Sequence, residues 1–319
     1  MLPGDLKKLI FGRCFNQEME HVTLPSSLQE LTFGFAFEQN MEHVTLPNSL
    51  QSLTCFNHWE CQNLHRLTFP ALQCLTFDDR FNGTLVGVAL PSTLKILNFG
   101  DSFNQRLRSV VFPRQLKHLT FGLKFDQPLD VTFPYTLQSL SFGHCFNQHF
   151  PEMNLPELER LAFGRDYYPT LDHMFFPANL KDLTLGSAFD IGTEKIHWPK
   201  DLQSLTFGSF FNQDIELLTL PTSLRSLTFG THFNQPVVKV NWPGCLQNLT
   251  FGHFFNQQMA GLGFLLLQHF YHLVLLYLKS LEIQRKSRSD FWLDVFFWGG
   301  TRIYLMTMTQ FGCKTLQPG

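Results

Sequence analysis

Neither sign of charge dominates this 319-residue sequence, which has 24 lysines and arginines against 26 aspartates and glutamates and a formal net charge of −2. Proteins that track a phosphate backbone usually carry a basic stripe, because contacts to phosphates supply most of their binding free energy. The sequence contains no such stripe and no acidic tail. Nucleic acid is therefore not an expected partner.

A disulfide framework is also missing. The seven cysteines are odd in number and irregularly spaced, whereas secreted chains usually carry their cysteines as a paired framework. Residues 1–8 contain no apolar run of the kind that forms a signal peptide. Both observations favour a reducing compartment, and we expect a cytoplasmic protein.

Catalytic motifs are absent as well. The sequence has no phosphate-binding glycine loop, no zinc-hydrolase helix motif and no nucleophile elbow. The one short glycine pair, at Gly261 and Gly263, is followed by leucines and lacks the preceding strand that would make it a phosphate loop. The sequence predicts neither an enzyme nor a bound cofactor.

What the sequence does have is a repeat, marked by prolines that recur every 21 to 23 residues. Self-similarity at such a period is typical of proteins built from stacked coils. The shared unit reads Pro-x-x-Leu-x-x-Leu-Thr-Phe-Gly-x-x-Phe-Asn-Gln, followed by about eight looser residues. The prolines that open the units are residues 3, 25, 47, 70, 91, 113, 134, 156, 177, 199, 221 and 243.

The columns of this unit have physical interpretations. The alternation in Leu31-Thr32-Phe33 is the period-two pattern of a strand with one buried face, so Leu and Phe are expected inside and Thr outside. The glycine that follows marks a turn that a side chain would obstruct. The next aromatic residue should lie over its equivalent in the neighbouring coil, forming a continuous spine. The asparagine after it can satisfy backbone groups of the turn and should form a ladder.

The looser half of each coil is too short for an ordinary helix. Proline biases the residue before it towards extended geometry, and His43-Val44-Thr45-Leu46 has an extended pattern. We therefore expect coils that are β-structured on both sides, with parallel strands stacked along one axis. The predicted fold is mainly β, a right-handed solenoid of about twelve 22-residue coils like that of leucine-rich-repeat proteins, with a parallel β-sheet.

The unit resembles the FNIP repeat, a relative of the leucine-rich repeats named after its Phe-Asn-x-Pro core. Phe233-Asn234-Gln235-Pro236-Val237 and Phe125-Asp126-Gln127-Pro128-Leu129 are its closest copies, although most coils lack the proline after Gln. The resemblance covers about residues 1–260 and implies an interaction solenoid. Such repeats are sometimes attached to F-box or kinase domains, neither of which is visible here. The family motif is structural and implies no catalytic residue.

Residues 261–319 lie outside the repeat and are expected to form a second unit, a helical or irregular tail. The apolar run 261–278 just reaches the length of a membrane span. Gln268, His269 and His272 fall on one helical face, which suits an amphipathic helix that caps the last coil. A capping helix, a membrane segment and a mistranslated region all stay open, so a membrane is a possible partner only through 261–278.

Two arrays of side chains suggest particular chemistry. His21, His43 and His65 recur at one offset and could hold a transition metal, but sequence duplication explains them without a ligand, and no metal is expected. The threonines between the strand Leu and Phe form a ladder of hydroxyls, as in ice-binding solenoids. Lys, Arg, Gln, Glu and His flank this ladder, and threonine suits any exposed strand position, so we favour the structural interpretation.

Variable residues that face outward are the best candidates for a binding surface. A fixed core with a variable surface is typical of a scaffold that presents that surface to a partner. We predict a non-catalytic protein-interaction scaffold; a structural or adhesive solenoid is the alternative, and an ice-binding surface is a weaker one. The candidate partner-binding residues are Glu30, His118, Arg160 and Asp182 beside the strand leucines, and His144 and Arg165 beyond the glycine.

Overall fold

The computed structural model describes residues 2–39, 41, 44–55, 70–167, 176–187, 196–258, 292–297 and 303–308. Its main body is one solenoid with a single parallel sheet of twelve strands, ordered as in the sequence. This arrangement confirms the predicted repeat solenoid. The strands are β1 Lys8–Ile10, β2 Glu30–Thr32, β3 Ser52–Cys55, β4 Cys74–Phe77, β5 Ile96–Asn98, β6 His118–Thr120, β7 Ser139–Ser141, β8 Arg160–Ala162, β9 Asp182–Thr184, β10 Ser204–Thr206, β11 Ser226–Thr228 and β12 Asn248–Thr250.

Neighbouring strands pair without any shift between coils. Leu31 of β2 faces Leu9 on one side and Leu53 on the other, and the same register continues to Leu249 of β12. Most strands begin one residue before the leucine and end at the threonine, so the strand predicted near Leu31-Thr32-Phe33 is confirmed, with its bounds one residue earlier. The reason is that the Phe33 amide still bonds to the next coil, but the chain turns at the following glycine.

The second side of the coil differs from the prediction. In the described coils each repeat has one short strand, and residues 44–46, expected to be extended, are assigned to no strand. This half closes instead through short turns, such as Val44 N–H to Met41 O at 3.0 Å. Proline at the end of every such segment has no N–H to donate to a ladder, which works against a second sheet.

Leucine and phenylalanine columns form the core. Leu28, Leu31 and their equivalents are almost fully buried, as the alternation of the strand requires. The predicted aromatic spine is confirmed: the ring centroids of Phe103 and Phe125 lie 5.9 Å apart, and those of Phe125 and Phe146 lie 6.0 Å apart. Trp59 and Phe189, also expected in the spine, lie outside the described residues.

A second aromatic column lies beside the spine, at the end of the strands. Phe99 and Phe121 of neighbouring coils stack at 5.3 Å, and each also stacks on the spine ring of its own coil, as Phe121 does on Phe125 at 4.1 Å. Strands in a sheet are about 4.8 Å apart. The spacing between coils therefore increases from about 4.8 Å at the strands to 5.3 Å at Phe99 and Phe121 and 5.9 Å at the spine rings Phe103 and Phe125.

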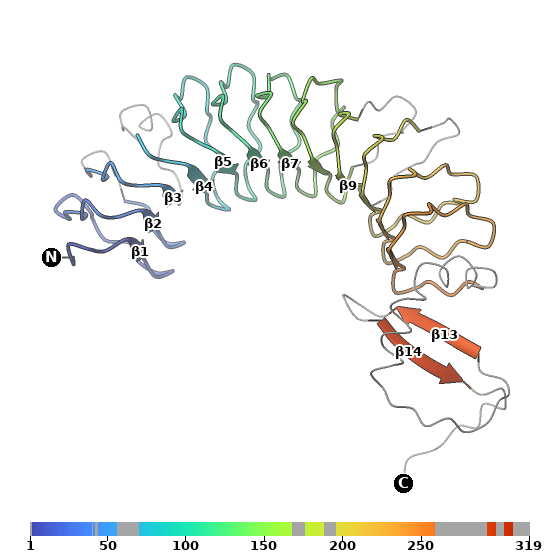
Figure 1. Cartoon of the computed structure of the whole chain (residues 1–319). Coiled ribbons are helices and arrows are strands. Elements are labelled where there is room, and N and C mark those ends of the chain that lie inside the picture. The colour runs from blue at the N-terminus through green and yellow to red at the C-terminus, as the bar shows by residue number, and fades with distance from the viewer. Residues whose placement is uncertain are drawn as a thin grey trace, which may run out of the picture.

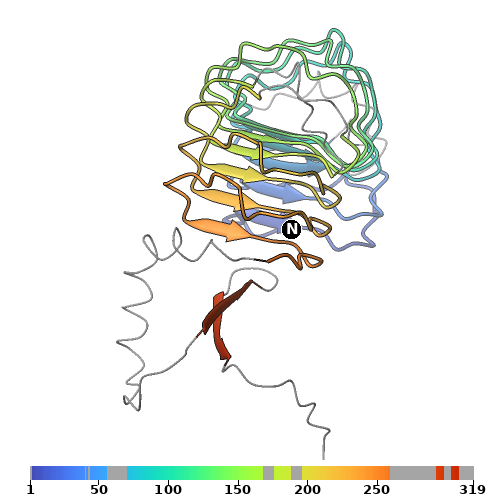
Figure 2. The same ribbon diagram turned by 90° about the vertical axis from the view of Figure 1, so that its right-hand side faces the viewer.

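This gradient explains the shape of the solenoid. Because the interior rings need more length per coil than the hydrogen-bonded strands, the stack bends with its sheet on the inner side. Figure 1 shows the resulting arc, with β1 to β9 along its inner edge and the looser segments along its outer edge. Figure 2 shows the strands side by side in one curved sheet. We call the inner surface the concave face.

Glycine and asparagine fix the contact between coils at the turn. A side chain at Gly122 would place its Cβ 2.1 Å from the carbonyl oxygen of Gly100, so the coils could not approach this closely. The predicted asparagine ladder is confirmed: Asn104 Oδ1 accepts the Asp126 backbone N–H at 2.9 Å and the Gln127 amide at 2.9 Å. Each turn is thus tied to the next.

The tail contains a feature that the sequence did not predict. Strands β13 (Trp292–Phe297) and β14 (Ile303–Met308) pair antiparallel, where a helical or irregular segment was expected. Among the described residues no helix is long and apolar enough to cross a membrane. The run 261–278 lies outside those residues, as does the expected boundary at residue 260, so both remain predictions.

Candidate binding surface on the concave face

Three columns of side chains cover the concave face: the residue before each strand, and the first and third residues of the strand. The first and third residues of the strand point away from the core because the leucine between them points inward. The residue before the strand is exposed or half-buried in every coil. The parallel register places equivalent residues of successive coils side by side. The solenoid therefore converts a periodic sequence into three continuous rows of surface residues.

The structure brings three of the six predicted site residues together. His118, Ser139, Arg160 and Asp182 occupy one row on the consecutive strands β6 to β9. Glu30 is in the same row on β2, four strands from His118, which is about 19 Å at a strand spacing of about 4.8 Å. Glu30 is also paired with Lys8 at 2.7 Å, so it does not belong to the same local cluster.

His144 and Arg165 lie elsewhere, in the turns that follow the strands. Arg165 places its guanidinium 5.1 Å from the ring centroid of Phe210, and the His144 carbonyl accepts the Asp166 backbone N–H at 2.7 Å. Phe210 in turn lies 4.7 Å from the His232 ring. These residues form a separate edge of the solenoid, and the structure does not join them to the concave row.

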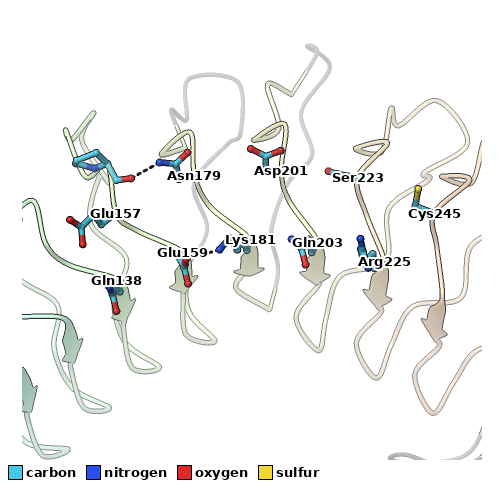
Figure 3. Close-up of a pocket in the computed structure, with 11 residues that line it drawn as sticks. Gln138, Glu157, Glu159, Asn179, Lys181, Asp201, Gln203, Ser223, Arg225 and Cys245 are labelled. Carbon is cyan, nitrogen blue, oxygen red and sulfur yellow. Dashed lines mark hydrogen bonds and ion pairs between the residues drawn. The ribbon is translucent and has the colours of Figure 1, made fainter.

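The concave face contains an open groove of about 620 Å³ where the strands of the last six coils begin. Figure 3 shows its side chains in two rows that cross the coils, with Gln138, Glu159, Lys181, Gln203 and Arg225 in the row nearer the strands. The groove contains both acidic and basic groups. Its lining residues are Gln138, Pro156, Glu157, Glu159, Asn179, Lys181, Asp201, Gln203, Ser223, Arg225 and Cys245.

The charges of the groove are only partly paired. Lys181 Nζ lies 2.6 Å from Glu159 Oε1, and this hydrogen bond lowers the pKa of Glu159. Within the part of the chain that the structure describes, Asp201 and Arg225 make no side-chain hydrogen bond or ion pair. These two groups are therefore available to charged groups of a ligand.

His118 lies near two cationic side chains, Arg160 and Lys117. Burial lowers the pKa of His118, and the nearby charges of Arg160 and Lys117 lower it further. The two nearby cations disfavour the protonated form of the imidazole, in addition to the effect of burial.

Sequence reasoning missed the groove residues because they precede the strand rather than lie in it. Asn179 Nδ2 donates to the Pro156 carbonyl at 2.6 Å, and Ser223 Oγ donates to the Leu202 carbonyl at 2.7 Å. Other coils use Ser or Thr in the same way, as Ser49 does with the Leu28 carbonyl at 2.6 Å. The recurring hydroxyl two residues after proline was the available signal.

The histidine array and the threonine ladder, both singled out in the sequence, can be located in the structure. His21 is described, whereas His43 and His65 lie outside the described residues; among the residues described, no group of three potential metal ligands occurs. The threonine ladder lies on the concave face, from Thr32 to Thr250, where the stack is bent (Figure 1). Its hydroxyls therefore do not form the flat array that an ice surface requires.

Comparison with known proteins identifies the repeat. The model of the FNIP repeat family matches residues 1–36, 81–124, 194–232 and 211–254. Among solved structures the chain is similar to CroV588, described as a novel circular LRR protein, with 37% identity and a TM-score of 0.71 over 81% of this chain. The chain spans 38% of that protein. A search of curated proteins found no match. The matched segments of this chain are therefore FNIP repeats, and its fold is similar to that of a leucine-rich-repeat protein.

Proposed function

We propose that this protein is a non-catalytic scaffold that binds another protein through its concave face. The observation that carries the proposal is the open groove across the last six coils, in which Asp201 and Arg225 have no fixed partner among the described residues. Charged groups that are already paired within the chain have less to gain from a ligand. Unpaired groups on a rigid sheet can form new ion pairs without rearrangement of the fold.

The division between core and surface supports the same function. The leucine and phenylalanine columns barely change between coils, whereas the concave rows change in size, charge and hydrogen-bonding capacity. Repeat solenoids commonly use such an extended surface for binding. The groove is open and crosses several coils, which suits recognition of an extended ligand.

The structural or adhesive alternative is distinguished by a binding experiment. We would prepare the charge-reversed variant Arg160→Glu with Asp182→Arg, and a control variant Arg108→Glu with Asp130→Arg on exposed residues outside the concave rows. Both variants leave the net charge unchanged. A partner recovered from a lysate should be lost with the first variant and kept with the second. Equal recovery with both would contradict binding through the concave face.

A further inference from the structure

The concave face has an unequal distribution of charge. Its three rows contain seven cationic residues and three anionic ones, while the whole chain has a net charge of −2. The excess of acidic residues therefore lies on the other surfaces. The cations are Lys7, Lys8, Lys95, Lys117, Arg160, Lys181 and Arg225, and the anions are Glu30, Glu159 and Asp182.

Two of the three anions in the rows are paired with a lysine of the same rows. Glu30 is bound by Lys8 at 2.7 Å, and Glu159 is bound by Lys181 at 2.6 Å. Asp182 is the remaining acidic residue of the three rows, next to Arg160 in the register of β8 and β9. Glu157 and Asp201 line the groove beside these rows. The cations without an acidic partner among the described residues are Lys7, Lys95, Lys117, Arg160 and Arg225.

The middle of the face is the most uniform part. From β4 to β7 the three rows contain Lys95 and Lys117 and no carboxylate. The two lysines are in neighbouring coils, because the Lys117 backbone N–H donates to the Lys95 carbonyl at 2.8 Å. Lys95 Nζ also donates to Gln73 Oε1 at 3.1 Å. The position of this lysine is therefore fixed, while its charge is not neutralised.

We infer that the concave face binds an acidic, extended segment of a partner protein, with its carboxylates on Lys95, Lys117, Arg160 and Arg225. Lys95 and Arg225 are six strands apart, or about 29 Å, which an extended segment of about nine residues would span at about 3.3 Å per residue. Ser, Thr and Gln occupy many of the positions between the cations and can bond to its backbone. This inference rests on the proposed function and specifies the class of partner.

The arrangement favours a protein segment over nucleic acid. Along the rows, the cations are separated by Asp182 and by neutral residues on several strands. A phosphate backbone instead needs closely spaced positive contacts. Separate cations among amide and hydroxyl groups match a chain that has carboxylates only at intervals.

The test measures fluorescence anisotropy of a labelled peptide of about ten residues with alternating Glu and Ser, titrated with the full chain. A peptide with Gln in place of Glu and an oligothymidine strand serve as competing probes. The double variant Lys95→Glu/Lys117→Glu should weaken binding of the acidic peptide about tenfold or more. The control Arg106→Glu/Arg108→Glu, which changes the net charge equally on exposed residues outside the rows, should leave it within about twofold.

Added salt should weaken binding of the acidic peptide, since the contacts are exposed ion pairs. Circular dichroism of both variants shows whether they fold. Equal loss in the two variants, equal binding of the Gln peptide or tighter binding of oligothymidine would overturn the inference.

A neutral variant separates this inference from the proposed function. Ser204→Trp obstructs the face without a change of charge. If a natural partner is lost with Ser204→Trp but kept with Lys95→Glu/Lys117→Glu, the concave face binds its partner and the preference for acidic segments is wrong. If neither variant affects the partner, the proposed function itself fails.

Discussion

Replacement of Phe125 by alanine tests the aromatic spine, on which the packing of the coils depends. Phe125 is fully buried, and its ring stacks on Phe121 at 4.1 Å, Phe103 at 5.9 Å and Phe146 at 6.0 Å. Removal of a buried phenylalanine costs about 3 to 5 kcal/mol through lost burial and a residual cavity. Because these three neighbours are rigid rings within a close-packed stack, we expect little collapse into the cavity and a value in the upper part of this range.

Two control variants separate burial from side-chain identity. Phe254→Ala removes the same atoms from a ring that is 51% exposed, and should cost much less because little buried surface is lost. Thr120→Ala changes an exposed side chain in the same coil as Phe125, and should stay within about 0.5 kcal/mol. Urea-induced unfolding followed by circular dichroism gives the midpoints and free energies of unfolding of the three variants.

The repeat architecture also predicts which coils lose stability in the Phe125→Ala variant. Each coil contacts only its neighbours, so stability is close to a sum of local terms, and Phe125→Ala should speed hydrogen exchange most in β5, β6 and β7. A cost for Phe125→Ala no larger than that for Phe254→Ala would refute the reasoning, because it would mean that the spine ring is not packed inside.

Three further predictions follow from the described contacts. Gly122→Ala should cost about 1 to 3 kcal/mol, since its Cβ would meet the Gly100 carbonyl oxygen at 2.1 Å, whereas Gly244→Ala, with nothing within 4 Å, should be near neutral in the same urea titration. Tyr167→Phe should raise the free energy of unfolding by about 1 kcal/mol, because burial raises the pKa of Tyr167 and its hydroxyl has no partner among the described residues; a lower urea midpoint would contradict this. Burial raises the pKa of Asp78, so the native state binds this proton more tightly than the unfolded chain, and wild-type stability should fall as pH rises through the window between the ordinary and the raised pKa. Asp78→Asn should lack this fall, and urea midpoints that change in parallel for both proteins across acidic pH would exclude the explanation.

The sequence predicted the features that depend on local patterns within one repeat and on its period. Alternation in Glu30-Leu31-Thr32 decides which side chains of the strand are buried. The recurrence of the Phe37 and Asn16 positions at a fixed offset predicts that equivalent phenylalanines stack and that equivalent asparagines form a ladder. These predictions needed only the period of the repeat and the geometry of a strand. The strand bounds lie one residue earlier than Leu31-Thr32-Phe33, because the position of the turn at Gly34 is set by the contact with the preceding coil.

The candidate site was predicted only in part. His118, Arg160 and Asp182 were identified because variation at an outward strand position is visible in the sequence. Asn179 and Arg225 were not, because the sequence does not show that residues before the strand lie on the same surface as the strand. Arg80 gives a second example: its guanidinium lies 3.6 Å from the ring centroid of Phe35, 45 positions earlier, a contact that no periodicity predicts.

By itself, the sequence determined the repeat, the buried columns and the order of the coils, since each depends on contacts between equivalent residues one period apart. The tertiary structure alone decided the curvature and which residues share the concave face. Stacked rings such as Phe125 and Phe146 are spaced more widely than hydrogen-bonded strands, and this difference, summed over twelve strands, turns the sheet inward. The bend places Lys117, Arg160 and Arg225 on one concave surface, a property of the whole stack that no single repeat contains.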